Sequence, residues 1–308
     1  MYDPDSPAQS SQVLLTELLR VLRLEATGAR TTEDIFTAAS HPMPSGRIYG
    51  GQVLAQAVLA AGHTVDEARS IHSMHGYFLR PGDTSRELTF GVDRIHDGRS
   101  FSQRRTQAYQ NGTPIFSMIS SFQDHDAGLE HQVPPPQGIP APEELLSDEE
   151  LTRGLPESAR ALITSRPIDA RHVDQGAMMD PKADRSSQQA VWMRITGTMP
   201  DDPILHQAVL AYLSDMSIQE SVLRSHGINW LTRGLKVASL DHAMWWHRQA
   251  RVDEWLLYVH KSPSSEGGRG LSMGTIYTRA GELVANVTQE IMIRVPEASV
   301  PHQDHEPR

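Results

Sequence analysis

The pentapeptide QAVLA occurs twice in this chain of 308 residues, at positions 56–60 and again at positions 207–211. The first copy lies in an apolar run that starts after Gly50 and Gly51 and stops at Gly62, which predicts a helix over this segment. Because the run is apolar on more than one stripe, we expect the helix to be enclosed by a sheet on nearly all sides.

Two further features follow each copy of the pentapeptide in the same order. The strand-like sequence YFLR at residues 77–80 corresponds to WWHR at residues 245–248, an offset of 168 residues. The turn pair at residues 111–112, Asn-Gly, is a strong hairpin signal and corresponds to residues 280–281 at an offset of 169. Three features in one order, at offsets of 151, 168 and 169 residues, predict an internal duplication. Each half is expected to hold one buried helix followed by about four antiparallel strands.

Proline content marks the boundary between the two halves. Six of the chain's 20 prolines fall within residues 133–156, a composition typical of a linker. An amphipathic helix is expected at the start of the first half, over residues 13–25. We therefore expect an α+β chain with a first unit, a proline-rich linker, a second unit and flexible tails, at residues 13–125, 126–185, 186–295, and 1–12 with 296–308.

Composition narrows the classes of function. The 38 acidic and 28 basic residues give a formal net charge of −10 at pH 7, which argues against a nucleic-acid partner. The chain has no cysteine, so disulfides, thiolate nucleophiles and cysteine metal sites are excluded. Neither a signal-peptide pattern nor an apolar run long enough to span a membrane is visible, and we expect a cytoplasmic protein.

Five longer motifs carry a resemblance to a known family. They are YGGQ at residues 49–52, HGYFLRPGD at 75–83, DGRSFSQRR at 97–105, DHAMWWHR at 241–248 and EWLLY at 254–258. Together they make the chain similar to the acyl-CoA thioesterase II family over residues 13–294. The resemblance implies a double hotdog fold, in agreement with the duplication. It also implies hydrolysis of fatty acyl-CoA, of medium to long chain, to a free fatty acid and CoA, without a cofactor or a metal.

The resemblance further implies three catalytic residues, Asp215, Ser239 and Gln289, all in the second half. Taken by itself, Asp215 lies on the apolar face of a helix, near its C-terminus, where burial and the helix dipole both disfavour a carboxylate. Gln289 shares a strand face with Val287 and Ile291, so its amide needs a hydrogen-bond partner if that face is buried. The structural alternatives are an aspartate exposed beyond the helix end and a core glutamine bonded to the backbone. Ser239 alone is an ordinary strand serine.

The duplication gives independent information on whether both halves carry this chemistry. Subtracting the offsets maps the three positions onto Thr64, Ile71 and Ser120. At these three positions the first half therefore has no carboxylate in the first, no hydroxyl in the second and no amide in the third. We predict one active site per chain, at the interface of the two halves.

These residue types suit hydrolysis of a thioester by water. The leaving thiol has a pKa of about 8.5, so a strong general acid is unnecessary. Asp215 is expected to accept a proton from the water while Ser239 and Gln289 fix its direction. Attack by Asp215 itself, through an anhydride, is the competing route. Backbone N–H groups at Gly50 and Gly51 are candidates to polarise the thioester carbonyl.

An acidic protein that binds the phosphates of CoA needs basic side chains placed locally. The candidates are Arg47, Arg80, Arg104 and Arg105. Adjacent residues in a strand face opposite ways, so at most one of Arg104 and Arg105 is expected to point at the ligand.

Two other functions stay open at this level. A hotdog hydratase or dehydratase would use an Asp–His pair; Asp241 and His242 are the candidates, although neighbours in a strand point to opposite faces. A catalytically silent acyl-CoA-binding protein is disfavoured by the intact trio. The H-x-x-H motif at residues 72–75 is not expected to bind a metal, since its spacing separates the two rings in a strand. A homodimer or larger homo-oligomer is expected, because hotdog sheets usually associate further.

Overall fold

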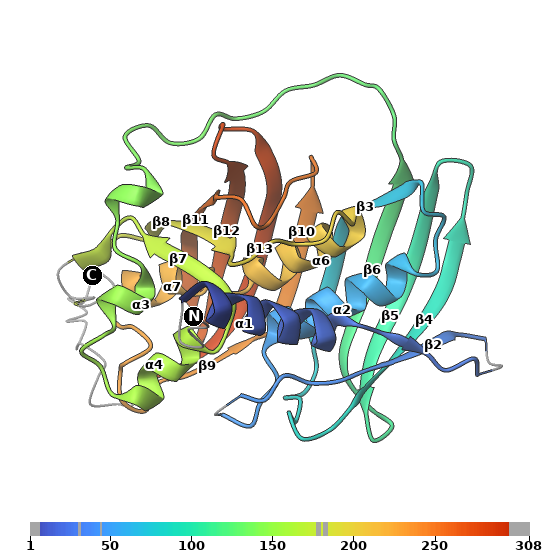
Figure 1. Cartoon of the computed structure of the whole chain (residues 1–308), viewed down its shortest axis with the longest axis horizontal. Helices are drawn as coiled ribbons and strands as arrows, with labels where there is room; N and C mark the ends of the chain where they lie inside the picture. The colour runs from blue at the N-terminus through green and yellow to red at the C-terminus, as the bar shows by residue number, and fades with distance from the viewer. Residues whose placement is uncertain (1–6, 30–31, 44, 177–179, 181–183, 296–308) are drawn as a thin grey trace, which may run out of the picture.

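The computed structural model describes residues 7–29, 32–43, 45–176, 180 and 184–295. Within these residues the strands form one 13-stranded sheet, in which every neighbouring pair is antiparallel. The helices lie against one side of the sheet (Figure 1). No helix of the described ranges is long and apolar enough to cross a bilayer.

Both halves supply helices and strands to this sheet. The first half forms α1 (Pro7–Leu22), β1 (Glu25–Ala26), β2 (Asp34–Ala38), α2 (Gly50–Gly62), β3 (Arg69–Phe78), β4 (Leu88–Asp97), β5 (Phe101–Gln110) and β6 (Thr113–Asp124). The second half forms β8 (Gln188–Ile195), α6 (Pro203–Ser214), α7 (Glu220–Ser225), β9 (Lys236–Ser239), β10 (Asp241–Trp246), β11 (Leu256–Glu266), β12 (Arg269–Thr278) and β13 (Leu283–Arg294).

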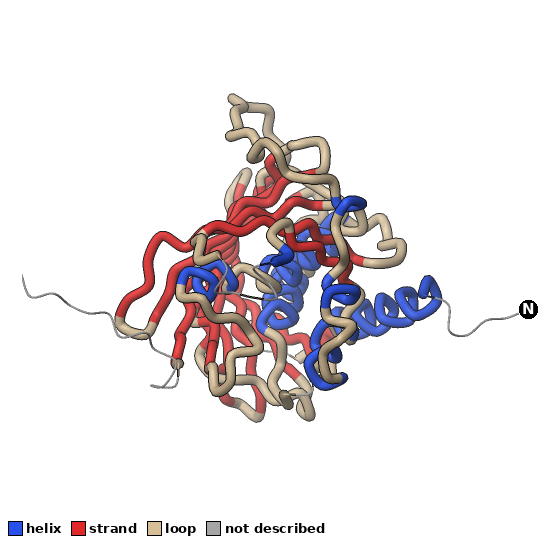
Figure 2. The backbone as a smooth tube through the Cα atoms, turned by 90° about the vertical axis from the view of Figure 1, so that its left-hand side faces the viewer, coloured by secondary structure: helices blue, strands red, loops and turns tan. Residues whose placement is uncertain are grey.

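The two QAVLA helices, α2 and α6, pack against each other, and the sheet curves around them (Figure 2). Every residue from Gly51 to Ala61 is buried, as expected for a helix enclosed by a sheet. The N-terminus of α6 is capped by Asp202, whose side chain accepts the N–H of Ile204 and of Leu205. Strand β3 pairs with β10 and so joins the two halves into one sheet. The arrangement is the double hotdog that the resemblance implies.

The predicted hairpin forms at the expected residues, whereas the predicted N-terminal helix starts earlier than expected. Residues 111–112 connect β5 to β6, and both have positive φ, 49° and 71°, the conformation that favours Asn-Gly. Helix α1 begins at Pro7, so the expected tail at residues 1–12 is helical from that point. The rest of the predicted tails, residues 1–6 and 296–308, lies outside the described residues.

The segment expected to be a linker contains secondary structure of its own. It holds a short 3-10 helix η1 (Pro142–Glu144), helices α3 (Asp148–Leu151) and α4 (Glu157–Thr164), and strand β7 (Ile168–His172). Strand β7 pairs with β8 and so extends the sheet. Its residues alternate in burial, as expected for a strand with one face toward the core. The proline-rich part lies along the second half (Figure 1), where Pro140 accepts a hydrogen bond from the Trp192 indole.

Candidate active site

Asp215 lies where the ends of the two central helices meet. It directly follows α6 and is only 4% exposed. Its Oδ2 accepts the backbone N–H of Gly51, at the start of α2, over 2.8 Å. A Cβ on Gly50 would lie 2.8 Å from the same oxygen, so this approach of helix and carboxylate requires a glycine. The carboxylate therefore sits between the two halves, beside the positive end of the α2 dipole.

Gln289 joins Asp215 to Ser239 through its amide. Its Nε2 donates to Asp215 Oδ1 over 3.0 Å and to Ser239 Oγ over 2.5 Å. Gln289 projects from β13, and Ser239 ends the short strand β9 that pairs with it. The structure thus brings together the three residues that the resemblance implies. Gln289 is fully buried, and its hydrogen-bond partners are side chains rather than backbone groups.

The buried setting changes the acidity of the carboxylate. Desolvation raises the pKa of Asp215 to about 6. Hydrogen bonds from Gln289 and Gly51, together with the positive charge of Arg166, lower the pKa and offset part of the effect of burial. Asp215 is therefore mostly ionised at neutral pH, yet basic enough to accept a proton.

His242 holds the other end of the Gln289 amide. Its Nδ1 lies 3.1 Å from Gln289 Oε1, and its Nε2 lies 2.9 Å from Ser214 Oγ. Burial lowers the pKa of His242 to about 4, so the ring is neutral. Because an amide oxygen only accepts, Nδ1 must carry the proton when it faces Oε1. Asp241 faces the other way and accepts the Glu290 N–H over 2.7 Å. The Asp–His pair that a hydratase would need does not form.

Gln219 belongs to this cluster and was missed by sequence reasoning. It precedes α7, and its Nε2 donates to Ser239 Oγ over 3.0 Å. Its side chain also lowers the pKa of the Asp215 carboxyl group. The spacing of four residues between Asp215 and Gln219 is that of one helical turn and could have indicated the contact.

A cavity of about 1520 Å³ opens onto the cluster. Asp215, Ser239, Gln219 and Gly50 line its wall. Apolar side chains line it as well, among them Leu14, Met43, Ile48, Val53, Phe78 and Ile115.

The candidate substrate-binding residues divide into those at the cavity and those away from it. Arg80 and Gly50 line the cavity, as does Arg47. Gly51 donates its N–H to Asp215, so this N–H is already used and cannot serve a carbonyl oxygen at the same time. Arg104 and Arg105 do not line the cavity.

Arg104 is a buried structural residue, which corrects the expectation that it binds substrate. It is 1% exposed, and all five of its N–H groups are used, on Thr64, Asp97 and the backbone of neighbouring strands. Arg105 faces the opposite side of the sheet and pairs with Asp93. The strand alternation was right, but the inward side leads to the first-half core rather than to a ligand.

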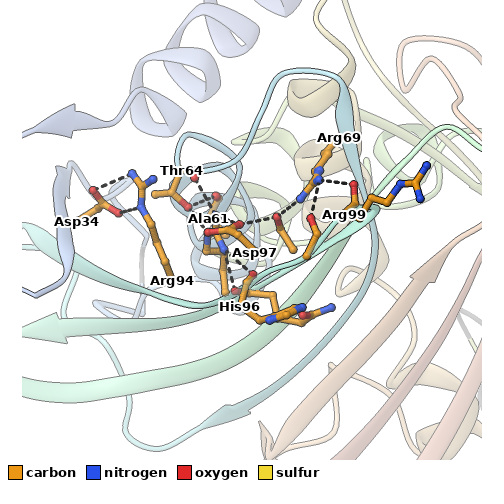
Figure 3. A network of polar contacts seen from close by, with 12 residues as sticks. Asp34, Ala61, Thr64, Arg69, Arg94, His96, Asp97 and Arg99 are labelled. Carbon is orange, nitrogen blue, oxygen red and sulfur yellow. Dashed lines mark hydrogen bonds and ion pairs between the residues drawn. The ribbon is translucent and has the colours of Figure 1, made fainter.

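The same network occupies the first-half counterpart of the active site. Thr64 and Asp97 lie together in it with Arg69 (Figure 3). Thr64 Oγ1 accepts from the buried guanidinium over 2.7 Å, where the second half has a carboxylate. Ile71 and Ser120, the other two mapped positions, are both buried.

The two histidine rings of the H-x-x-H motif have separate partners. His72 Nε2 lies 2.8 Å from Ser121 Oγ, whereas the ring of His75 packs edge-on against Trp245. Across the described part of the chain, no group of three or more His, Asp or Glu side chains is arranged to hold a metal ion.

Family models match both halves of the chain. A model described as acyl-CoA thioesterase matches residues 164–292, which include Asp215, Gln219, Ser239 and Gln289. A second model, described as the acyl-CoA thioesterase N-terminal domain, matches residues 39–123.

Curated proteins and solved structures are similar over nearly the whole chain. An acyl-CoA thioesterase 2 from Haemophilus influenzae is 32% identical, over 92% of this chain and 99% of its own. The human acyl-coenzyme A thioesterase 8 is 33% identical, over 94% and 92%. The structure of an acyl-CoA thioesterase II from Mycobacterium marinum superposes with a TM-score of 0.74 at 38% identity, covering 92% of this chain and all of the other.

Proposed function

The chain belongs to the acyl-CoA thioesterase family and hydrolyses acyl-CoA thioesters, and we propose that Asp215, Ser239 and Gln289 carry out the reaction. Membership of this family argues against both alternatives that the sequence left open, a hotdog hydratase or dehydratase and a catalytically silent acyl-CoA-binding protein. The observation that carries the proposal is the Gln289 amide, which bridges the carboxylate and the hydroxyl at the cavity wall.

Asp215 acts as the general base. The Gly51 and Gln289 N–H groups fix its two oxygens, and a carboxylate has lone pairs left for a water proton. The water attacks the thioester carbon while Ser239 and Gln289 fix the direction of attack. The thiolate of CoA leaves without strong acid assistance, because the pKa of a thiol is about 8.5.

The N-terminus of α2 supports the developing oxyanion in this proposal. Since the Gly51 N–H is taken by Asp215, Gly50 supplies the backbone N–H at the cavity wall. The lack of a Cβ at Gly50 lets a substrate carbonyl approach closely, and the helix dipole favours negative charge there.

The substrate in this proposal is a fatty acyl-CoA of medium to long chain. The cavity of about 1520 Å³ exceeds the roughly 300–1,000 Å³ of most small-ligand pockets, and its apolar side chains suit an alkyl chain. Arg47 and Arg80 are exposed at the cavity and are our candidates for the CoA phosphates. Turnover measured against acyl-CoA chain length tests this assignment.

Three expectations about the whole protein stay proposals. We place two hotdog units at residues 13–125 and 186–295, joined through residues 126–185. A homodimer or larger homo-oligomer is supported by Tyr77 and Ile119, which are 62% and 52% exposed on neighbouring strands. Sedimentation of the purified chain measures the assembly. A cytoplasmic location rests on the sequence alone.

Replacing Asp215 by asparagine is the direct test of the base. We expect Asp215→Asn to lower kcat by at least about 100-fold, because an amide cannot accept the proton of the attacking water. Free thiol release from an acyl-CoA measures the rate, and circular dichroism checks the fold. A variant with near-normal turnover would overturn the assignment.

Asp241→Asn is the matched control. Asp241 is a half-buried carboxylate on β10 that accepts a backbone N–H and does not line the cavity. We expect it to keep its turnover. Single-turnover hydrolysis in ¹⁸O-labelled water then separates the two routes. Direct attack of water leaves Asp215 unlabelled, whereas hydrolysis of an anhydride puts label into its carboxylate.

A further inference from the structure

The Ser239 hydroxyl accepts two hydrogen bonds at the active site. Gln219 Nε2 donates to Ser239 Oγ over 3.0 Å and Gln289 Nε2 donates to it over 2.5 Å. A serine hydroxyl has two acceptor positions and one proton. Because both acceptor positions are filled, the hydroxyl can take part in further hydrogen bonds only as a donor.

The orientation of both amides follows from their shared partner. An ionised carboxylate only accepts hydrogen bonds, so Gln289, which bonds to Asp215, must turn its NH2 group toward Asp215 and Ser239 and its oxygen away. Gln219 presents its NH2 group to the same Ser239 hydroxyl. For Gln289, the oxygen meets the Nδ1–H of His242.

The proton of Ser239 is thereby available for donation into the cavity. No side chain or backbone group of the described residues accepts it, and Ser239 lines the cavity wall. Gln219 lines the same wall and is 9% exposed, held at the start of α7 by its backbone carbonyl, which accepts from Val222 and Leu223.

We propose that Gln219 is a positioning residue that acts through Ser239. Together with Gln289 it turns the Ser239 hydroxyl into an obligatory donor toward the carbonyl oxygen of the thioester. This inference rests on the proposed catalytic roles of Asp215 and Gln289, and it changes the role of Ser239 from directing the water to donating to the carbonyl oxygen. It assigns Gln219 a part in catalysis and makes Ser239 a stabiliser of the oxyanion.

The reaction then balances as follows. The water oxygen bonds to the carbonyl carbon, one water proton goes to Asp215, and the carbonyl electron pair moves to the oxygen that Ser239 donates to. When the C=O bond re-forms, the C–S bond breaks and its electron pair leaves with the CoA sulfur. The thiolate takes the proton from Asp215, which restores the base.

The test is a double-mutant cycle of Gln219→Met and Ser239→Ala. Methionine keeps the length of the side chain but donates no hydrogen bond. At pH 8.5, where Asp215 is ionised in every variant, we expect Gln219→Met to lower kcat about tenfold with KM within about twofold. In the Ser239→Ala background the same substitution should change kcat by less than about twofold, because its route of action has been removed.

Gln110→Met is the control for the loss of a buried glutamine. Gln110 is 7% exposed, bonds the backbone of Asp83 and Arg86, and does not line the cavity. We expect it to keep its kcat at pH 8.5. Gln219→Leu repeats the cycle if the methionine variant does not fold.

The outcomes separate this inference from the proposed function. Unchanged turnover in Gln219→Met, or an equal loss in both backgrounds, overturns the role of Gln219 and leaves the trio intact. Normal turnover in Ser239→Ala and Asp215→Asn overturns the trio, and the inference with it. A larger effect on KM than on kcat would assign Gln219 to substrate binding and also contradict the proposal.

Discussion

We expect the carboxyl group of Asp215, as the proposed base, to determine the response of this enzyme to pH. Burial raises its pKa to about 6, and the protonated form cannot accept a proton from water. We expect kcat/KM to be constant above pH 7 and to fall tenfold per pH unit below about 6. A profile measured from pH 4.5 to 8.5 checks this; a fall that begins only near pH 4 would place the base elsewhere.

At the same scale, single residues show why the site could be predicted only in part. Asp215 and Gln289 came from the family resemblance, and the hydrogen bond between them explains why two buried polar groups on apolar faces are tolerated. Gln219 was missed because its hydrogen-bond partner Ser239 lies on β9, 20 residues further along the chain. Arg104 was misassigned because a sequence gives a guanidinium but not the Thr64 and Asp97 groups that saturate it.

The helices and strands could be predicted from the sequence more readily than the contacts between them. Helix α2 and the β5–β6 hairpin follow from apolar spacing and from Asn-Gly, which are local signals. Strand β7 lies in the segment that the sequence indicates to be a linker. The burial of its five residues alternates only because the strand pairs with β8 in the sheet, so the sequence alone carries no strand signal there. The meeting of α6 with the start of α2 depends on packing and has no local signal.

That meeting gives a prediction at the scale of the helix. A Cβ at Gly50 would lie 2.8 Å from Asp215 Oδ2 and 3.1 Å from Phe78 Cζ, so Gly50→Ala must displace the carboxylate or the helix. We expect kcat/KM to fall by about 10- to 100-fold, the size of effect that a misplacement of about 1 Å produces. Steady-state hydrolysis measures the loss.

The other end of the same helix supplies the control. A Cβ at Gly62 would approach only the flexible side chain of Ile204, 2.9 Å away. Gly62→Ala should keep kcat/KM within about threefold, because Ile204 can shift without moving Asp215. Equal losses in the two variants would mean that alanine disturbs the helix as a whole and not the carboxylate.

The whole molecule repeats one unit, but its two halves have diverged in what they bury between the helices. The second half places Asp215 beside the cavity, whereas the first half fills the corresponding position with Thr64 and the saturated guanidinium of Arg104. A chain with two similar units should therefore bind one substrate molecule. Titration calorimetry with a non-hydrolysable acyl-CoA thioether is expected to give about one site per chain, in the wild type and in Asp215→Asn alike, because in the proposed mechanism Asp215 acts on water rather than on the ligand. Two sites per chain would show that the first half also accepts acyl-CoA, despite its buried arginine.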